Sequence, residues 1–306
     1  MMVFLVILAG LMPSFLLVGL GGLVRERLSA NAWQGLDRLN FEILFPALLF
    51  VAASSRPIEL SAVATIAPAV WALLTCGLIA GYFARRFGPE RFLDFAGAWQ
   101  TAWRFNSAVG IVAAGALSGG DPALMAVAIG MAVPLANVFA VSALSRGGAL
   151  GPMATLRKVA LNPFLLASLS GVLLGLSGYR LPGPVLAPLS LLADAAIPIA
   201  LISVGATMNW GALARLNRFN GTLCGVKLLL LPTLVTVTAL ALGASGSYVA
   251  VLLVFAALPT ASAAHVLAAG FGADRELSAT LVAQSTLLSA LTLPIWVTFA
   301  QVFFLS

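Results

Sequence analysis

The chain is a succession of long apolar runs separated by short polar gaps. Ten such runs can be marked, and each is long enough to cross a hydrocarbon core of ~30 Å as a helix. None alternates apolar and polar residues at every second position, as the strands of a membrane barrel do. We therefore predict an all-α integral membrane protein with ten transmembrane helices. The runs cover residues 3–23, 39–55, 61–84, 95–117, 122–144, 161–178, 187–208, 219–243, 247–271 and 277–303.

The basic residues are distributed unevenly over the gaps. Twelve of the 16 Lys and Arg residues lie in alternate gaps, whereas the other gaps hold only Arg56 and Arg180. Short loops with an excess of Lys and Arg stay on the cytoplasmic side of a membrane. The pattern predicts a multi-pass protein of the cytoplasmic (inner) membrane with both termini outside. The last two basic residues, Arg104 and Lys227, lie inside apolar runs, and we expect Lys227 to reach toward the cytoplasm.

The composition of the chain also indicates an integral membrane protein. Of the 306 residues, 61% are hydrophobic and only 8% are charged, against about 25% charged residues in a soluble domain. The net charge of +6 arises from loop residues that form no single face, so we expect no nucleic-acid partner. Cys76 and Cys224 both lie in apolar runs, and the chain shows neither metal-ligand spacing nor a Gly-rich phosphate loop. We expect no enzyme, no cofactor and no bound metal.

The gap at residues 145–160 divides the runs five and five. An odd number of helices per half forces the second half into the opposite orientation, so a duplicated unit would form an inverted repeat, as in many secondary transporters. An acidic residue precedes a proline by four positions in the second run (Glu42 and Pro46) and in the seventh (Asp194 and Pro198). We predict two inverted five-helix repeats, residues 1–144 and 161–306, joined by a cytoplasmic linker.

The fourth run contains a charge at membrane depth. Arg104 lies nine residues inside the run, which places it roughly 14 Å into the hydrocarbon core. A guanidinium there must face protein, water or a counter-charge. We predict a binding site for an anion, built from Arg104, Asn106, Ser107 and Gly110. The alternative is that Arg104 forms a structural pair with an acid on a neighbouring helix.

The ninth run contains a proline near its middle. Pro259 removes a backbone hydrogen bond, and in a membrane the freed groups are tolerated where they are buried or line a cavity. We predict that this helix is broken and crosses the fourth, with Pro259, Thr260, Ser262 and His265 completing the substrate site. Two alternatives stay open: an ordinary proline kink, and a histidine that is only a packing residue instead of a proton relay.

Transport coupled to a cation needs further polar groups. Glu42 and Asp194 are candidates for a coupling carboxylate. The alternative is that they only stabilise their helices, because the helix dipole favours a carboxylate near the N-terminus. Hydroxyl and amide oxygens on the tenth run could coordinate sodium, although such groups also bond between membrane helices. We expect Na⁺ or H⁺ as the coupling ion. The candidates on the tenth run are Gln284, Ser285, Thr286 and Ser289.

Several of these segments resemble one known family. The segment 104–110 is similar to the Asn-x-x-x-Gly element of the auxin efflux carrier family, which includes plant auxin transporters and bacterial relatives. Segment 259–261 resembles the motif in the ninth span of that family. Further similarity is found at residues 45–50, 198–201 with Gly205, 285–289 and 292–296.

The resemblance implies a fold and a function for the whole chain. It implies ten helices in two inverted repeats, a scaffold and a transport domain, and a site where broken helices four and nine cross. Because the fourth run has no proline, any break in it should fall at Gly110. We expect secondary-active transport of a small organic anion such as a carboxylate by alternating access. The alternatives are a membrane receptor or sensor and an intramembrane enzyme. The expected partners are the anion and the lipid bilayer, and we allow for a homodimer.

Overall fold

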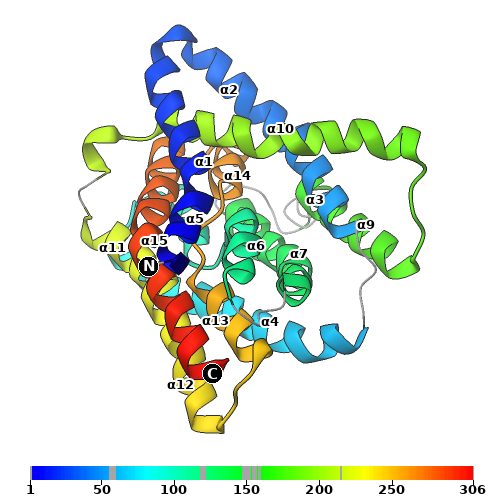
Figure 1. Cartoon of the computed structure of the whole chain (residues 1–306). Helices are drawn as coiled ribbons and strands as arrows, with labels where there is room; N and C mark the ends of the chain where they lie inside the picture. The colour runs from blue at the N-terminus through cyan, green and yellow to red at the C-terminus, as the bar shows by residue number, and fades with distance from the viewer. Residues whose placement is uncertain are drawn as a thin grey trace.

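The protein is described by a computed structural model that covers residues 2–54, 60–117, 122–146, 153, 157, 160–213 and 216–305. These residues form helices and the turns between them, with no strand among them (Figure 1). The prediction of an all-α protein is therefore confirmed. The predicted linker at 145–160 lies mostly outside the described residues.

Apart from the helix at residues 30–39, the helices of the first half follow the predicted apolar runs. A π-helical turn, η2, lies between α2 and α3, and a 3-10 turn, η4, follows α5. The elements are α1 (Met2–Val24), η1 (Arg25–Arg27), α2 (Ala30–Leu39), η2 (Asn40–Leu44), α3 (Phe45–Ser54), α4 (Leu60–Tyr82), η3 (Phe83–Phe87), α5 (Phe92–Trp99), η4 (Gln100–Ala102), α6 (Ser107–Gly115) and α7 (Pro122–Arg146).

The second half also follows the predicted runs. A second π-helical turn, η6, lies between α11 and α12. The elements are α9 (Pro163–Ser177), α10 (Gly183–Thr207), η5 (Trp210–Ala212), α11 (Arg218–Gly225), η6 (Val226–Leu230), α12 (Leu231–Leu242), α13 (Ser247–Ala257), α14 (Ala263–Phe271) and α15 (Arg275–Phe304).

Five continuous helical stretches in the described part of the chain are long and apolar enough to cross a membrane. They are α4 with η3, α7, α10, α11 through α12, and α15. The fourth and ninth runs do not qualify because each is interrupted, between η4 and α6 and between α13 and α14. These helices support an integral membrane protein that spans the bilayer several times.

Two groups of helices pack mainly among themselves. The first contains α1, α3, α9 and α10, with α10 along one edge of the molecule beside α1, α2 and α3 (Figure 1). A Cβ atom at Gly205 of α10 would lie 1.9 Å from the carbonyl oxygen of Val18, so glycine is required for the contact between α1 and α10. The second group contains α4 to α7 and α11 to α15. Each group takes helices from both halves of the chain.

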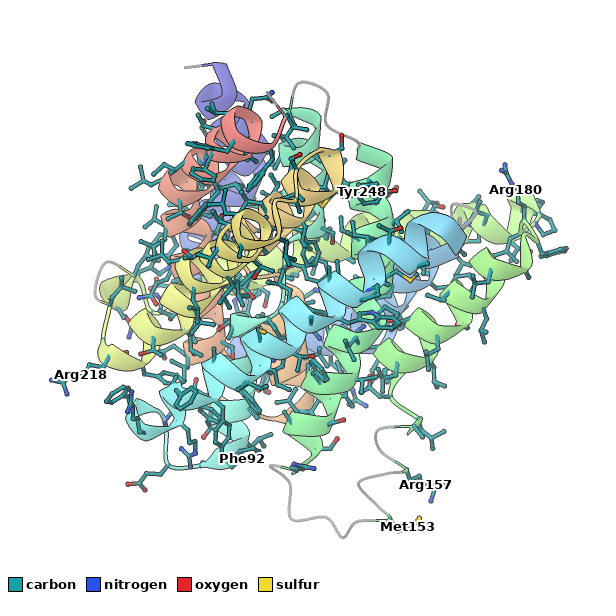
Figure 2. All side chains as sticks on the ribbon, turned by 90° about the horizontal axis from the view of Figure 1, so that it is seen from below. Phe92, Met153, Arg157, Arg180, Arg218 and Tyr248 are labelled. Atoms are coloured by element: carbon teal, nitrogen blue, oxygen red, sulfur yellow. The ribbon has the colours of Figure 1, made fainter. Side chains whose placement is uncertain are left out.

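The ends of the helices fall on two opposite sides of the molecule. Figure 2 shows Arg157 and Arg218, from gaps rich in basic residues, toward one side together with Phe92. Arg180 and Tyr248 lie toward the other side. Arg180 belongs to a gap with few basic residues, and Tyr248 directly follows another such gap. This separation agrees with the alternation of gaps in the sequence, and the orientation relative to the cytoplasm stays a prediction.

The helix α2 was not expected from the apolar pattern. It begins after Ser29, whose hydroxyl accepts a hydrogen bond from the Ala32 backbone N–H at 3.2 Å, a common way to cap a helix. One face of α2 buries Trp33 and Asp37, and the other residues of the helix are partly or fully exposed. The helix therefore brings a carboxylate into the protein next to the second apolar run.

Candidate functional site

The fourth run is broken at residues 103–106, before Gly110. The helical path ends with η4 at Ala102, and α6 begins at Ser107 with Asn106 as its N-cap. The Asn106 side chain accepts a hydrogen bond from the Val109 N–H at 3.2 Å. The expectation of a break at Gly110 was wrong, because this glycine lies inside α6. A Cβ atom there would lie 2.9 Å from Leu258 Cδ1, so Gly110 allows α6 to approach the end of α13.

The ninth run is broken at residues 258–262. In a continuous helix the Thr260 N–H would donate to the Ala256 carbonyl. Here the Thr260 N–H donates to Ser285 Oγ at 3.0 Å, and the Ala256 carbonyl accepts from Lys227 Nζ at 3.0 Å. The backbone N–H and the backbone carbonyl that the break separates therefore have hydrogen-bond partners on α15 and η6. Backbone polar groups inside a membrane require such partners.

The two breaks lie against each other. The Asn106 N–H donates to the Pro259 carbonyl at 2.8 Å, and the rings of Phe105 and Phe255 have centroids 4.6 Å apart. Both α6 and α14 begin next to this contact, so the positive ends of two helix dipoles lie close to it. We call residues 103–106 and 258–262 the junction.

Arg104 is buried in the junction with neutral hydrogen-bond partners. Its side chain is 5% exposed. Its Nε donates to Gln100 Oε1 and its Nη2 to Asn137 Oδ1, both at 2.8 Å. Asn137 on α7 in turn donates to Ser168 Oγ of α9 at 2.9 Å. Among the described residues Arg104 forms no ion pair, so the alternative of a structural acid partner finds no support there.

Lys227 is a second buried cation close to the junction. Its side chain is 2% exposed, and its Nζ donates to the carbonyl of Ala256 in the last turn of α13. The expectation that Lys227 reaches toward the cytoplasm was therefore wrong. The π-helical turn η6 is packed against α13, and the lysine side chain is held between helices.

The other residues predicted for the substrate site occupy different environments. Asn106 and Ser107 are half-buried, whereas Thr260 and Ser262 are buried. The hydroxyl of Thr260 has no hydrogen-bond partner among the described residues. His265, in the first turn of α14, is fully buried, and its Nε2 lies 3.3 Å from Asp37 Oδ1.

His265 belongs to a polar cluster that was not predicted from the sequence. The carboxylate of Asp37 on α2 accepts hydrogen bonds from Arg275 Nε at 2.8 Å, from a second guanidinium nitrogen of Arg275 and from the Ser203 hydroxyl. We call Asp37, Ser203, His265 and Arg275 the Asp37 cluster. It joins α2 and α10 to α14 and α15, and so connects the two helix groups. The spacing of Trp33, Asp37 and Asn40 on one helical face could have revealed the burial of Asp37.

The candidates for ion coupling are split between surface and interior. Glu42 and Asp194 are exposed, and Glu42 pairs with Arg38 at 2.8 Å. Gln284, Ser285, Thr286 and Ser289 are buried along α15. Gln284 accepts from Asn220 Nδ2 at 2.9 Å, and the hydroxyls of Thr286 and Ser289 donate to carbonyls of α15 itself. A coupling role for any of these residues stays a prediction. The described residues contain no group of three or more His, Cys, Asp or Glu that could hold a metal ion.

Comparisons with known proteins show similarity to membrane transport proteins. Residues 150–297 match the family model described as "Membrane transport protein". The chain is 27% identical over 297 residues to a Rhizobium meliloti (strain 1021) protein named "Putative malonate transporter", and the match covers 92% of each chain. It is 31% identical over 143 residues, 46% of each chain, to an "Uncharacterized transporter" of Methanothermobacter thermautotrophicus (strain Delta H).

These matches confirm the predicted family resemblance. The family description names membrane transport, and both relatives are named as transporters and not as enzymes. Together with the long apolar helices, they support a membrane transporter that is integral to the bilayer.

Proposed function

Starting from the match to the membrane transport protein family, we propose that the chain is a secondary-active transporter for a small organic anion, most simply a carboxylate. One observation carries the proposal: Arg104 is a buried cation at the meeting point of two broken helices, and its described partners are neutral amides. Such a charge in a membrane protein calls for an anionic partner. The name of the Rhizobium meliloti relative suggests malonate as the first anion to test.

The junction supplies the groups that a carboxylate needs. The guanidinium offers a planar fork that matches the two carboxylate oxygens. The N-termini of α6 and α14 add the positive ends of two helix dipoles. Half-buried Asn106 and Ser107, with buried Thr260 and Ser262, would surround the anion with amide and hydroxyl groups.

Transport would proceed by alternating access of this site to the two sides of the membrane. The two packing groups support the division into a scaffold (α1, α3, α9 and α10) and a transport domain that carries both breaks. We propose that the domains arise from inverted repeats at residues 1–144 and 161–306. The support is that both breaks occur in corresponding spans and that each group draws on both halves of the chain. The twelve basic residues in alternate gaps support an orientation with both termini outside.

A thermal-shift screen of the purified protein tests the proposed substrate class. Malonate, succinate, acetate, benzoate and indole acetate would be compared with chloride and with neutral amides of the same size. A ligand at 100 times its Kd adds ~2.7 kcal/mol to the stability of the folded state, which gives a measurable shift. We expect at least one carboxylate to stabilise the protein while its amide does not. Equal responses to acids and amides would contradict the proposal.

A further inference from the structure

Lys227 carries a buried charge that the proposed anion site does not use. It lies in η6, and π-helical turns of this kind occur frequently at functional sites. A neighbouring helix also bonds to this turn: Trp296 Nε1 of α15 donates to the Leu228 carbonyl at 3.0 Å. Burying an ammonium inside a membrane protein is costly, so its position needs a physical reason.

The partner of Lys227 is the carbonyl end of a broken helix. Near the end of α13, the Leu258 N–H donates to the Phe255 carbonyl at 3.4 Å and Lys227 donates to the Ala256 carbonyl. The last carbonyls of a helix carry the negative end of its dipole. In transporters with broken helices, such carbonyls and helix C-termini are where a coupling cation is coordinated.

Lys227 and Arg104 bond toward different neighbours. Arg104 is hydrogen-bonded to α7, and through Asn137 to α9 of the other helix group. Lys227 is bonded to α13, and η6 packs against α4, α11, α12 and α15 of its own group. Arg104 thus lies toward the interface between the groups, whereas Lys227 lies within one group.

We propose that Lys227 is a built-in cation site: its ammonium occupies the carbonyl end of α13 that an inorganic coupling cation would otherwise fill. This inference rests on the proposed transport function. It implies that the cycle needs no sodium, and that the proton on Lys227 Nζ is the only cation this position exchanges. Removing the side chain should convert the position into a binding site for a small monovalent cation.

Cation binding by purified variants tests the proposal without any substrate. The wild type, Lys227→Ala and Lys227→Gln would be melted in choline chloride, in sodium chloride and in methylammonium chloride at equal ionic strength. We expect Lys227→Ala to melt lower than the wild type in choline. Sodium or methylammonium should raise its melting temperature by about 2 °C or more, as a site with a Kd below the salt concentration would. The wild type should not respond.

Lys227→Gln and Trp296→Phe sharpen this test. The Gln amide can still donate to the Ala256 carbonyl but brings no charge, so we expect it to melt below the wild type. Trp296→Phe removes the other external bond of η6 and keeps the ammonium, so it should be as insensitive to cations as the wild type. The proposal is overturned if sodium stabilises the wild type over choline, if Lys227→Gln matches the wild type, or if folded Lys227→Ala ignores both cations. If Lys227→Ala does not fold, the wild-type response to sodium and the Lys227→Gln comparison still decide.

A flux measurement separates this proposal from the proposed function. Uptake of labelled malonate into proteoliposomes would be compared with sodium or choline outside. Equal uptake supports a site filled by Lys227, and uptake that requires sodium contradicts it. Absence of any carboxylate binding would instead count against the anion site, and the cation-dependent melting of Lys227→Ala would still report on Lys227.

Discussion

Two buried polar regions of the molecule differ in how their charges are matched. In the Asp37 cluster a carboxylate meets a guanidinium, a histidine and a hydroxyl, so its negative charge has partners on three other helices. At the junction, Arg104 is a cation whose described side-chain hydrogen bonds go to two neutral amide oxygens. Asp37 and His265 in the cluster and Arg104 at the junction are almost completely buried, whereas the Arg275 side chain is 23% exposed.

The difference separates a structural role from a binding role. A buried ion pair is satisfied as it stands, and removing one partner leaves the other charge without compensation. A buried cation with neutral partners gains when an anion arrives. We therefore assign the connection between helix groups to the Asp37 cluster, and ligand binding to the junction. Substitutions in the Asp37 cluster should therefore lower stability, whereas substitution of Arg104 at the junction should lower ligand affinity.

The largest loss of stability is expected from Asp37→Asn. This variant leaves Arg275 and His265 without their carboxylate, and breaking a buried pair in this way costs ~3–5 kcal/mol. The apparent melting temperature should fall by several degrees. Carboxylate affinity, measured below the transition, should change little. A stable Asp37→Asn protein that has lost anion binding would reverse the two assignments.

Asn137→Ala should lower stability less and change its response to the anion. The substitution leaves one side of the Arg104 guanidinium unpaired in the empty protein, at a cost of ~1–3 kcal/mol. A carboxylate that binds Arg104 would take the vacated position and recover much of the loss. The ligand-induced shift should then exceed that of the wild type. A smaller shift would mean that Asn137 itself binds the ligand or shapes its site.

Ser285→Ala should lower the stability of the broken segment at residues 258–262. Its hydroxyl is the partner of the buried Thr260 N–H, and leaving that group unpaired costs ~1–2 kcal/mol. Ser289→Ala is a matched control on the same helix, because the Ser289 hydroxyl bonds to the Thr286 carbonyl of α15 itself. Denaturant unfolding in detergent should show the larger effect for Ser285→Ala. Equal effects would indicate that the Thr260 N–H finds another partner.

Glu42→Gln should have the smallest effect. Glu42 and Arg38 form an exposed pair one helical turn apart, and such pairs contribute little to stability. The melting temperature and the carboxylate affinity should both match the wild type. A changed dependence of transport on pH would instead support the predicted role of Glu42 in ion coupling.

The sequence predicts the helices better than their interruptions. Apolar runs of about 20 residues leave the chain few alternatives to helices, and the described helices follow the predicted runs. The break at Pro259 was predictable because proline cannot donate a hydrogen bond. The break at residues 103–106 was not, because no residue there forbids a helix. It depends on Asn106 as a cap and on the Pro259 carbonyl, which is distant in sequence.

Partners that are distant in sequence also explain what was missed in the site. Asp37 lies in a polar gap, and its burial depends on Ser203, His265 and Arg275 from the other half of the chain. Lys227 resembles an ordinary interfacial lysine until the broken end of α13 is placed beside it. The charge of Arg104 at membrane depth was visible in the sequence because the apolar run extends on both sides of it.

The affinity of Arg104→Gln for the carboxylate that most stabilises the wild type tests the central claim most directly. Titration calorimetry would compare it with Arg104→Lys and with Arg38→Gln, which removes an exposed arginine instead. We predict that Arg104→Gln loses at least ~100-fold in affinity, because a charge-assisted hydrogen bond contributes ~1.5–3 kcal/mol and the guanidinium offers two. Its melting temperature without ligand should not fall, and Arg104→Lys should recover little. Wild-type affinity in Arg104→Gln would show that the arginine is structural and that the anion binds elsewhere.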